Sequence, residues 1–145
     1  MGPQRLSLRA AATVADTPKF EPAARVKQVV SRKAWNIEFE SGKSQFTRAA
    51  DAELTKLLDD LLIASGTMVE VHGHTDNQGP VPTNMTLSEE RAFAVKTWLE
   101  KMSPANFPQG RVKVFAHGPT EPVESNASAA GRAKNRRVEI VMGVQ

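Results

Sequence analysis

Segments with the periodicity of a strand alternate along the chain with segments of helical periodicity, and this alternation restricts the fold more than any other feature of the sequence. A strand with one buried face repeats apolar residues at every second position, whereas a surface helix repeats them every three or four. The expected elements, in chain order, are a strand at 35–40, a helix at 47–66, a strand at 67–74, a helix from about 87 to 102, a strand at 111–117, a long loop and a strand at 137–142.

This order predicts an α/β fold of the α+β sandwich type. Helices that follow strands favour parallel crossover connections, and such helices pack on the sheet. We therefore expect a βαβαββ order, in which a mixed four-stranded sheet is packed by helices on one or both faces.

The same periodicities predict which side chains are buried. Val69 and Val71 are expected on the apolar face of their strand, with the even-numbered residues of 70–74 on the other face. In the last strand, Arg137 and Glu139 are expected to form a solvated face.

The second helix is expected to start near Leu87, after a loop at 76–84 that is rich in glycine and proline. Thr86 followed by Glu89 fits a capping box, and Ser88 is an alternative cap. The expected buried stripe comprises Ala92, Val95, Leu99 and Met102, with Trp98 at its margin.

Charge is distributed unevenly along the chain. Residues 1–33 contain seven basic and two acidic side chains, which leaves twelve basic and fourteen acidic side chains for residues 34–145. The first segment also contains three prolines and no sustained apolar period. We therefore expect residues 1–33 to be a linker or N-terminal arm and residues 34–145 to be the folded domain, whose charge does not call for a nucleic-acid partner.

Length and composition exclude several classes of protein. The chain has 145 residues, which suits one domain of the usual ~100 to 200 residues. No apolar run approaches the ~20 residues of a membrane helix, and Arg9 interrupts the apolar residues that a secretion signal would need. Without cysteine there is no disulfide or thiolate metal site. The motifs of serine hydrolases, zinc proteases and phosphate-binding loops are absent, which favours binding over catalysis.

Asp76 and Arg91 are the leading candidates for a binding site. Open α/β sheets bind ligands beyond the carboxyl ends of their strands, beside helix N-termini. Asp76 follows the strand at 67–74, and Arg91 belongs to the start of the next helix, so both charges can face one cleft. Such a cleft complements a zwitterion, for example the head group of an amino acid. The alternative is that the two side chains form a structural ion pair or are both solvated.

Three motifs resemble the OmpA C-terminal domain family, which includes peptidoglycan-associated lipoproteins and flagellar stator proteins of the MotB type. They are HGHTDNQG at 72–79, LSEERAFAV at 87–95 and GRAKNRRVEI at 131–140, and the resemblance covers about residues 34–142. It implies an OmpA-like fold that binds peptidoglycan noncovalently, without a cofactor and without enzymatic activity. It further implies a periplasmic location in the cell envelope, in a domain of a longer outer-membrane-associated protein that it anchors to the cell wall.

The resemblance also implies a ligand, the diaminopimelate of the peptidoglycan stem peptide. In the family, the aspartate at the position of Asp76 binds the ligand's ammonium, and the arginine at the position of Arg91 binds its carboxylate. One departure is at 41–43, where this chain has Ser-Gly-Lys and the family often has an asparagine, so this rim contact is expected to be lost or replaced by backbone. The other ligand-binding residues that we expect are Asn84, Arg136, Thr75 and Asn77.

Two other functions fit parts of the sequence. A metal-dependent hydrolase could use His72, His74 and Asp76 as zinc ligands, with His117 at the end of another strand. A nucleic-acid module could use the basic cluster at 131–137, although the domain around it carries more acidic than basic groups and no aromatic stacking residues adjoin the cluster.

Overall fold

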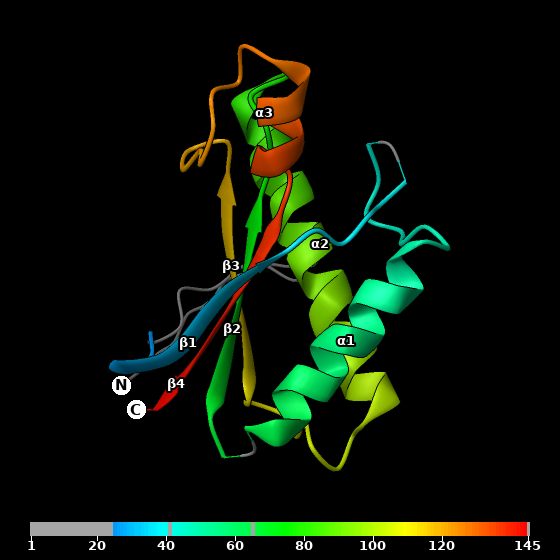
Figure 1. Cartoon of the computed structure of the whole chain (residues 1–145), viewed down its shortest axis with the longest axis vertical. Coiled ribbons are helices and arrows are strands. Elements are labelled where there is room, and N and C mark those ends of the chain that lie inside the picture. The colour runs from blue at the N-terminus through cyan, green and yellow to red at the C-terminus, as the bar shows by residue number, and fades with distance from the viewer. Residues whose placement is uncertain (1–24, 41, 65, 145) are drawn as a thin grey trace, which may run out of the picture.

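The computed structural model describes residues 25–40, 42–64 and 66–144. Over these residues the chain forms a mixed sheet with strand order β1-β4-β2-β3 and helices between the strands (Figure 1). The elements are β1 (Gln28–Trp35), α1 (Ala50–Ile63), β2 (Met68–His74), α2 (Val81–Met102), β3 (Val112–Gly118), α3 (Ala129–Asn135) and β4 (Val138–Val144). The predicted α/β class with a mixed four-stranded sheet is confirmed.

The pairing in the sheet places β2 at its centre. β2 runs parallel to β3 and antiparallel to β4, and β1 pairs with β4 antiparallel at the edge. Because β2 and β3 are parallel, the connection between them crosses over the sheet, and α2 makes this connection. The carboxyl ends of β2 and β3 therefore open at the same edge, next to the start of α2.

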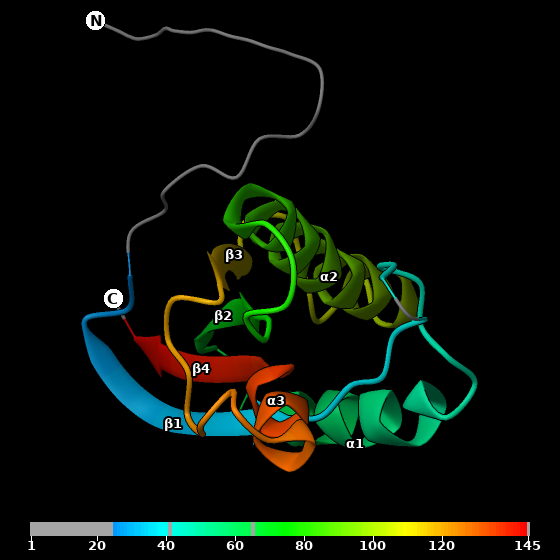
Figure 2. The ribbon, with the colours of Figure 1, turned by 90° about the horizontal axis from the view of Figure 1, so that it is seen from above.

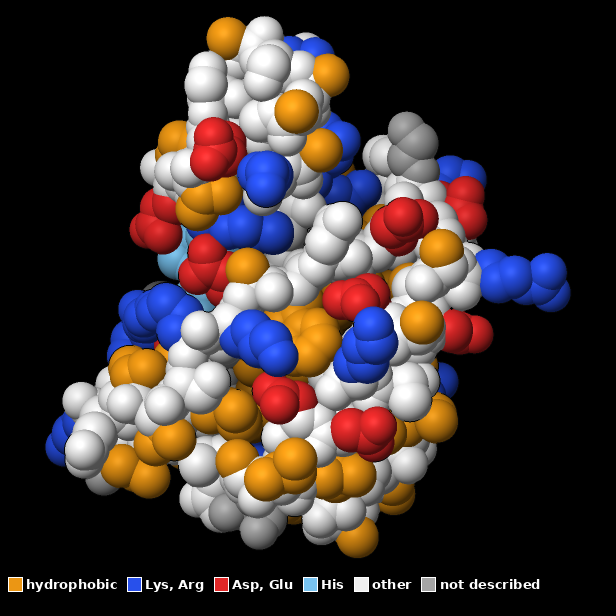
Figure 3. All heavy atoms as spheres, viewed as in Figure 1, with side chains coloured by type: hydrophobic (Ala, Val, Ile, Leu, Met, Phe, Trp, Pro, Cys, Tyr) orange, Lys and Arg blue, Asp and Glu red, His pale blue; other side chains and the backbone are white. Residues whose placement is uncertain are grey.

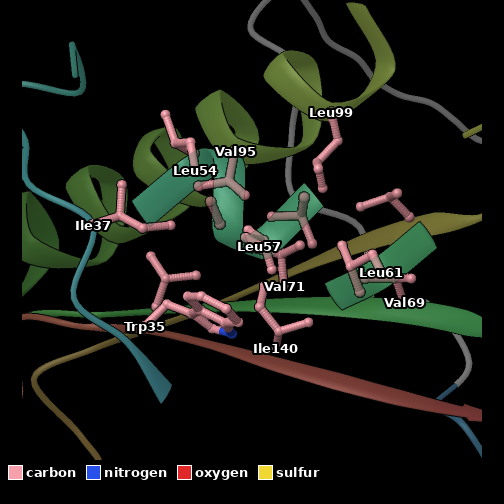
Figure 4. Packing of buried hydrophobic residues seen from close by; sticks show 14 of the residues in the cluster. Trp35, Ile37, Leu54, Leu57, Leu61, Val69, Val71, Val95, Leu99 and Ile140 are labelled. Carbon is pink, nitrogen blue, oxygen red and sulfur yellow. The ribbon is translucent and has the colours of Figure 1, made fainter. Parts of the chain in front are cut away.

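The hydrophobic core lies between the sheet and the helices α1 and α2, which cover the same face of the sheet (Figures 1 and 2). The leucines of α1 meet the apolar side chains of α2, β2 and β4 there, and Trp35 and Ile37 extend the cluster toward one end (Figure 4). Val69 and Val71 belong to this core, as the strand periodicity predicts. The fully buried leucines and valines of the core are Leu54, Leu57, Leu61, Val69, Val71, Val95, Leu99 and Val112.

The first strand lies earlier in the chain than its periodicity predicts. The prediction was a strand at 35–40, but β1 ends at Trp35, and residues 28–33, which we expected to belong to the arm, form most of it. Val29 and Val30 are exposed on this edge strand, so it has no apolar alternation that a sequence pattern could reveal. Within 35–40 the structure has buried Ile37 and an isolated bridge from Phe39 to Phe46.

The second helix also starts earlier than predicted, at Val81 and not near Leu87. Pro82 is compatible with this start because the first helical residues need no intrahelical N–H partner, and the Asn84 N–H already donates to the Pro80 carbonyl (3.1 Å). The predicted stripe is buried except for Met102, which is 58% exposed because the helix ends there.

The segment predicted as a long loop contains the helix α3. Ser128 caps it by accepting a hydrogen bond from the Gly131 N–H at 2.9 Å. At its other end the fully buried Asn135 accepts hydrogen bonds from the N–H groups of Val123 and Glu124, and it donates one to the Glu124 carbonyl. The side chain of Asn135 thus holds the β3–α3 loop in place.

We expect Asn135→Ala to lower the free energy of unfolding by about 2 to 4 kcal/mol, because two partly buried backbone N–H groups lose their acceptor. Urea unfolding followed by circular dichroism measures this change. Asn106→Ala is the matched control, since Asn106 is exposed and bonds only to the Ser103 hydroxyl through its side chain; its change should stay below about 0.5 kcal/mol. Equal effects of the two substitutions would contradict the role given to Asn135.

Candidate functional site

A pocket of about 1010 Å³ opens at the carboxyl end of β2. Its walls come from the β2–α2 loop, the first turns of α2, residues 36–39 with Gly42, and the junction of α3 with β4. Figure 3 shows the hollow between the end of the molecule that carries α3 and the neighbouring loop, with basic side chains along it. This is the edge at which the sheet topology predicts a ligand site.

Asp76 is held in the pocket by two hydrogen bonds. One carboxylate oxygen accepts from the Gln78 N–H at 2.9 Å, which fixes the turn after β2. The other oxygen accepts from the Arg136 guanidinium at 2.7 Å. Asp76 is 8% exposed, so its carboxylate is fixed by the loop and by a charge from the start of β4.

Arg91 faces the same pocket from α2. Its Nε donates to the carbonyl oxygen of Lys43 at 2.9 Å, and its guanidinium lies over the ring of Phe39, 4.9 Å from the ring centre. Burial lowers the pKa of Arg91, the positive charge of Arg136 lowers it further, and Asp76 acts in the opposite direction. The three charged groups are therefore close enough to influence one another.

The ion pair in this pocket differs from the one that the sequence suggested as an alternative. Asp76 pairs with Arg136 and not with Arg91. The pocket thus brings the Asp76 carboxylate together with the guanidinium groups of Arg91 and Arg136, and the Arg91 guanidinium is oriented by a backbone carbonyl and an aromatic ring. Glu38, Glu90 and Arg137 also line the pocket. A ligand with an ammonium group and more than one carboxylate or amide group would complement this arrangement.

The remaining predicted ligand-binding residues, Thr75, Asn84 and Asn77, do not all line the pocket. Thr75 and Asn84 are buried and line the pocket, where the Thr75 hydroxyl donates to the Asp76 carbonyl and the Asn84 amide donates to the Gln78 carbonyl, both at 2.8 Å. Asn77 is exposed, accepts a hydrogen bond from the Gln78 side chain, and does not line the pocket. The structure therefore brings Asp76, Arg91, Asn84, Arg136 and Thr75 together, and it leaves Asn77 at the loop surface.

Two contributions to the site were not predicted as such from the sequence. Phe39 supplies the ring under Arg91, and the Lys43 carbonyl holds its Nε. The departure from the family pattern at 41–43 pointed to this segment, where the contact to the ligand was expected to be lost or replaced by backbone; the structure shows the Lys43 carbonyl bonded to Arg91. No sequence pattern marks Phe39, since its role depends on how the segment after β1 folds over α2.

Glu70, His72 and His74 lie on the face of β2 turned away from the core, as predicted, but all three are buried. His72 contacts the Glu70 carboxylate at 2.8 Å and the ring of His117 at 2.7 Å. Burial lowers the pKa of His72, and burial together with Arg137 lowers the pKa of His74 to about 3. Both imidazoles are therefore neutral near pH 7.

This arrangement does not assemble the zinc site that the hydrolase alternative requires. Both ring nitrogens of His72 are engaged, and the Asp76 carboxylate is paired with Arg136. Among the described residues, the histidine and carboxylate ligand atoms that lie within 4.8 Å of one another belong to His74, His117 and Glu121, and neither His72 nor Asp76 is in that group.

Three of the four basic side chains of the cluster at 131–137 have partners within the protein. Arg132 donates to the Asn126 carbonyl and Arg136 bonds to Asp76. Arg137 was predicted to be solvated, but it is 8% exposed and pairs with Glu139 at 2.7 Å. The prediction was wrong because the β3–α3 loop covers this face of β4. The carbonyl of Glu121, in that loop, accepts a hydrogen bond from Arg137. Of the four basic side chains, Arg137 is buried, Arg132 is partly buried, and Lys134 and Arg136 are exposed.

No helix in the described part of the chain has both the length and the apolar character to cross a bilayer.

The sequence is similar to those of several known proteins. The chain is 39% identical over 122 residues to the outer membrane porin F of Pseudomonas fluorescens, covering 84% of this chain and 36% of the porin. It is 38% identical over 94 residues to the peptidoglycan-binding protein ArfA of Mycobacterium tuberculosis, covering 64% of this chain and 28% of ArfA. The chain thus spans about a third of the length of these curated relatives.

Solved structures agree. The cell wall anchor of the T6SS from Pseudomonas aeruginosa superposes with a TM-score of 0.66 and 31% sequence identity, covering 83% of this chain and 87% of that one. The family model described as the OmpA family matches residues 38–136, which include all six predicted ligand-binding residues. The chain belongs to the OmpA family.

Proposed function

We propose that this protein binds peptidoglycan noncovalently and anchors an envelope protein to the cell wall. The observation that carries the proposal is the grouping of Asp76, Arg91 and Arg136 around one open pocket, within the segment that matches the family. Relatives named as a peptidoglycan-binding protein and as a cell wall anchor support it. Binding of this kind makes and breaks no covalent bond, so the protein acts as an anchor and not as an enzyme.

The ligand that best complements the pocket is the diaminopimelate residue of the stem peptide. Its distal carbon carries an ammonium, which Asp76 binds, and a carboxylate, which Arg91 binds through its planar guanidinium. A carboxylate has about four acceptor sites, and Asp76 uses one for Gln78 and one for Arg136. Asp76 can therefore accept the ligand's ammonium without releasing Arg136.

The remaining polar groups of the pocket extend this recognition. Arg136, which is about half exposed, faces the part of the ligand that carries the second carboxyl or amide group. Asn84 and Thr75 hold the loop that carries Asp76. Asn77, at the loop surface, contacts the stem peptide beyond the pocket.

The location follows from the ligand. A protein that binds peptidoglycan functions in the periplasm, within the cell envelope, and the residues that precede the folded domain connect it to an outer-membrane-associated component. Residues 1–24, most of the segment that we expected to be an arm, lie outside the described residues.

A titration followed by NMR tests this function. We expect the stem tripeptide that ends in meso-diaminopimelate to shift the backbone amide signals of 75–78 and the side-chain signals of Arg91. The same tripeptide with lysine in place of diaminopimelate lacks the distal carboxylate. The diaminopimelate tripeptide amidated at its distal carboxylate keeps the group but lacks its negative charge. Both should bind at least tenfold more weakly, since each loses a charged partner. Equal affinity for all three peptides, or shifts confined to another region, would contradict the assignment.

A further inference from the structure

His72, His74 and His117 gather on the face of β2 and β3 that is turned away from α1 and α2, and histidine side chains reach the surface at one edge of the molecule (Figure 3). The rings of His74 and His117 stack with their centres 4.7 Å apart. Glu121, in the loop after β3, completes the cluster, with one carboxylate oxygen 3.6 Å from Nδ1 of His117. None of the proposed ligand-binding roles uses this cluster.

A chain of hydrogen bonds fixes the orientation of His117. The Glu70 carboxylate can only accept, so His72 donates to it through Nε2 at 2.8 Å. The other ring nitrogen of His72, Nδ1, shares a hydrogen bond of 2.7 Å with Nε2 of His117. This leaves Nδ1 of His117 as the ring nitrogen that points toward the Glu121 carboxylate, 3.6 Å away. A ring nitrogen and a carboxylate oxygen are thus turned toward each other, as two ligands of one metal ion are.

His74 adds a second, independent observation. It is 3% exposed, and neither of its ring nitrogens has a hydrogen-bond partner among the described residues. A buried polar group without a partner costs free energy, so such groups in folded proteins call for an explanation. A ligand atom of His74 lies within 4.8 Å of those of His117 and Glu121.

We propose that His74, His117 and Glu121 form a binding site for a divalent metal ion of the zinc type, with water completing the coordination. Two imidazoles, one carboxylate and a water are a donor set that zinc uses in proteins. Tetrahedral ligands bonded at ~2.0 to 2.1 Å lie roughly 3.3 Å apart. The contact of 3.6 Å between His117 and Glu121 is close to that spacing already.

The surroundings suit such an ion. Glu70 and His72 support His117 from behind, in the way that carboxylate–histidine pairs orient metal ligands. Arg137, whose positive charge acts on His74, is paired with Glu139 at 2.7 Å. Glu121 is the most exposed ligand, so its side chain can close on an ion that enters from solvent.

Isothermal titration of the untagged, metal-stripped protein with zinc chloride tests the proposal. We expect one zinc ion per chain to bind and the thermal midpoint to rise, whereas magnesium, which prefers oxygen ligands, should have no effect. Cobalt should give the visible absorption of a tetrahedral site. These measurements need no peptidoglycan, so their outcome is independent of the proposed cell-wall function.

Glu121→Gln removes one ligand from an exposed position and should weaken zinc binding at least tenfold while leaving the metal-free midpoint unchanged. Glu124→Gln, an exposed glutamate of the same loop, is the matched control and should bind zinc like the wild type. His74→Phe should abolish the rise in midpoint with zinc. If Glu121→Gln and the wild type bind zinc equally, or if no zinc binds, His74, His117 and Glu121 do not form a zinc site and the proposal is wrong.

Discussion

Asp76→Ala and Arg91→Ala are each expected to abolish sedimentation of the protein with purified peptidoglycan, while its thermal midpoint stays close to that of the wild type. Removing either side chain leaves the opposite charge of the ligand unpaired in the pocket, a loss of about 2 to 5 kcal/mol. This corresponds to a roughly 30-fold to several-thousand-fold weaker affinity. Quantifying the protein that pellets with the sacculi measures the effect.

The two substitutions differ in their effect on the fold. Arg91 contacts the Lys43 carbonyl and the Phe39 ring at a half-buried position, so its loss should barely change unfolding. Asp76 accepts from the Gln78 N–H and from the half-exposed Arg136, and the loss of both bonds should cost about 1 to 2 kcal/mol of stability. A thermal scan of each variant separates this cost from the loss of binding.

Matched controls come from exposed charges outside the pocket. Asp59→Ala on α1 and Arg48→Ala before α1 remove the same two types of charge, and both residues are exposed. These variants should sediment with peptidoglycan like the wild type. If Asp76→Ala and Arg91→Ala also sediment like the wild type, the pocket is not the peptidoglycan site.

Gly73→Ala is expected to give the largest loss of stability, about 3 kcal/mol or more. A Cβ at this position of β2 would overlap the backbone carbonyl of Ser88 on α2. The added Cβ and the Ser88 carbonyl oxygen are both fixed by the main chain, so no side-chain rotation can separate them. The overlap can be relieved only if α2 moves away from the sheet. The contact is reinforced by the Ser88 hydroxyl, which accepts from the Gly118 N–H at 3.0 Å.

The same substitution should also weaken peptidoglycan binding, because β2 leads into the loop of Asp76 and α2 carries Arg91. Urea unfolding and sedimentation are the two measurements. Gly66→Ala is the control for a glycine whose environment is open: its φ of +90° disfavours alanine, but a Cβ there would meet nothing within 4 Å. It should cost only about 1 to 2 kcal/mol. A loss below 1 kcal/mol for Gly73→Ala would show that α2 does not pack on β2 as described.

Most of the fold could be predicted from the sequence where an element buries one regular face. β2, β3 and the body of α2 have apolar residues at the period of their own secondary structure, so local pattern and tertiary burial agree. Those elements also carry Asp76 and Arg91, which is why the pocket could be placed at the end of β2. The start of α2 was missed because Pro80, just before the helix, and Pro82, its second residue, resemble a loop.

The edge strand β1 and the helix α3 show where pattern reading fails. β1 exists because β4 supplies hydrogen-bond partners along its length, and its largely exposed side chains carry no alternation. α3 has no apolar stripe, and a single buried side chain, Asn135, ties it to the preceding loop. β1 depends on a strand that is distant in the chain, and α3 depends on one polar residue. Neither dependence produces a periodic pattern of apolar residues in the sequence.

The amino-acid sequence alone determined the α/β class, the membership of the family, and the positions of a carboxylate just after β2 and a guanidinium within α2. Only the tertiary structure decided that Asp76 pairs with Arg136, which is 60 residues away, and that a phenylalanine and a backbone carbonyl orient Arg91. It also decided that three histidines of two parallel strands meet on one buried face. The physical reason is that a local pattern of apolar residues depends only on which side chains are buried. Which group a charge or an imidazole contacts depends on the distances between strands, helices and loops in the folded protein.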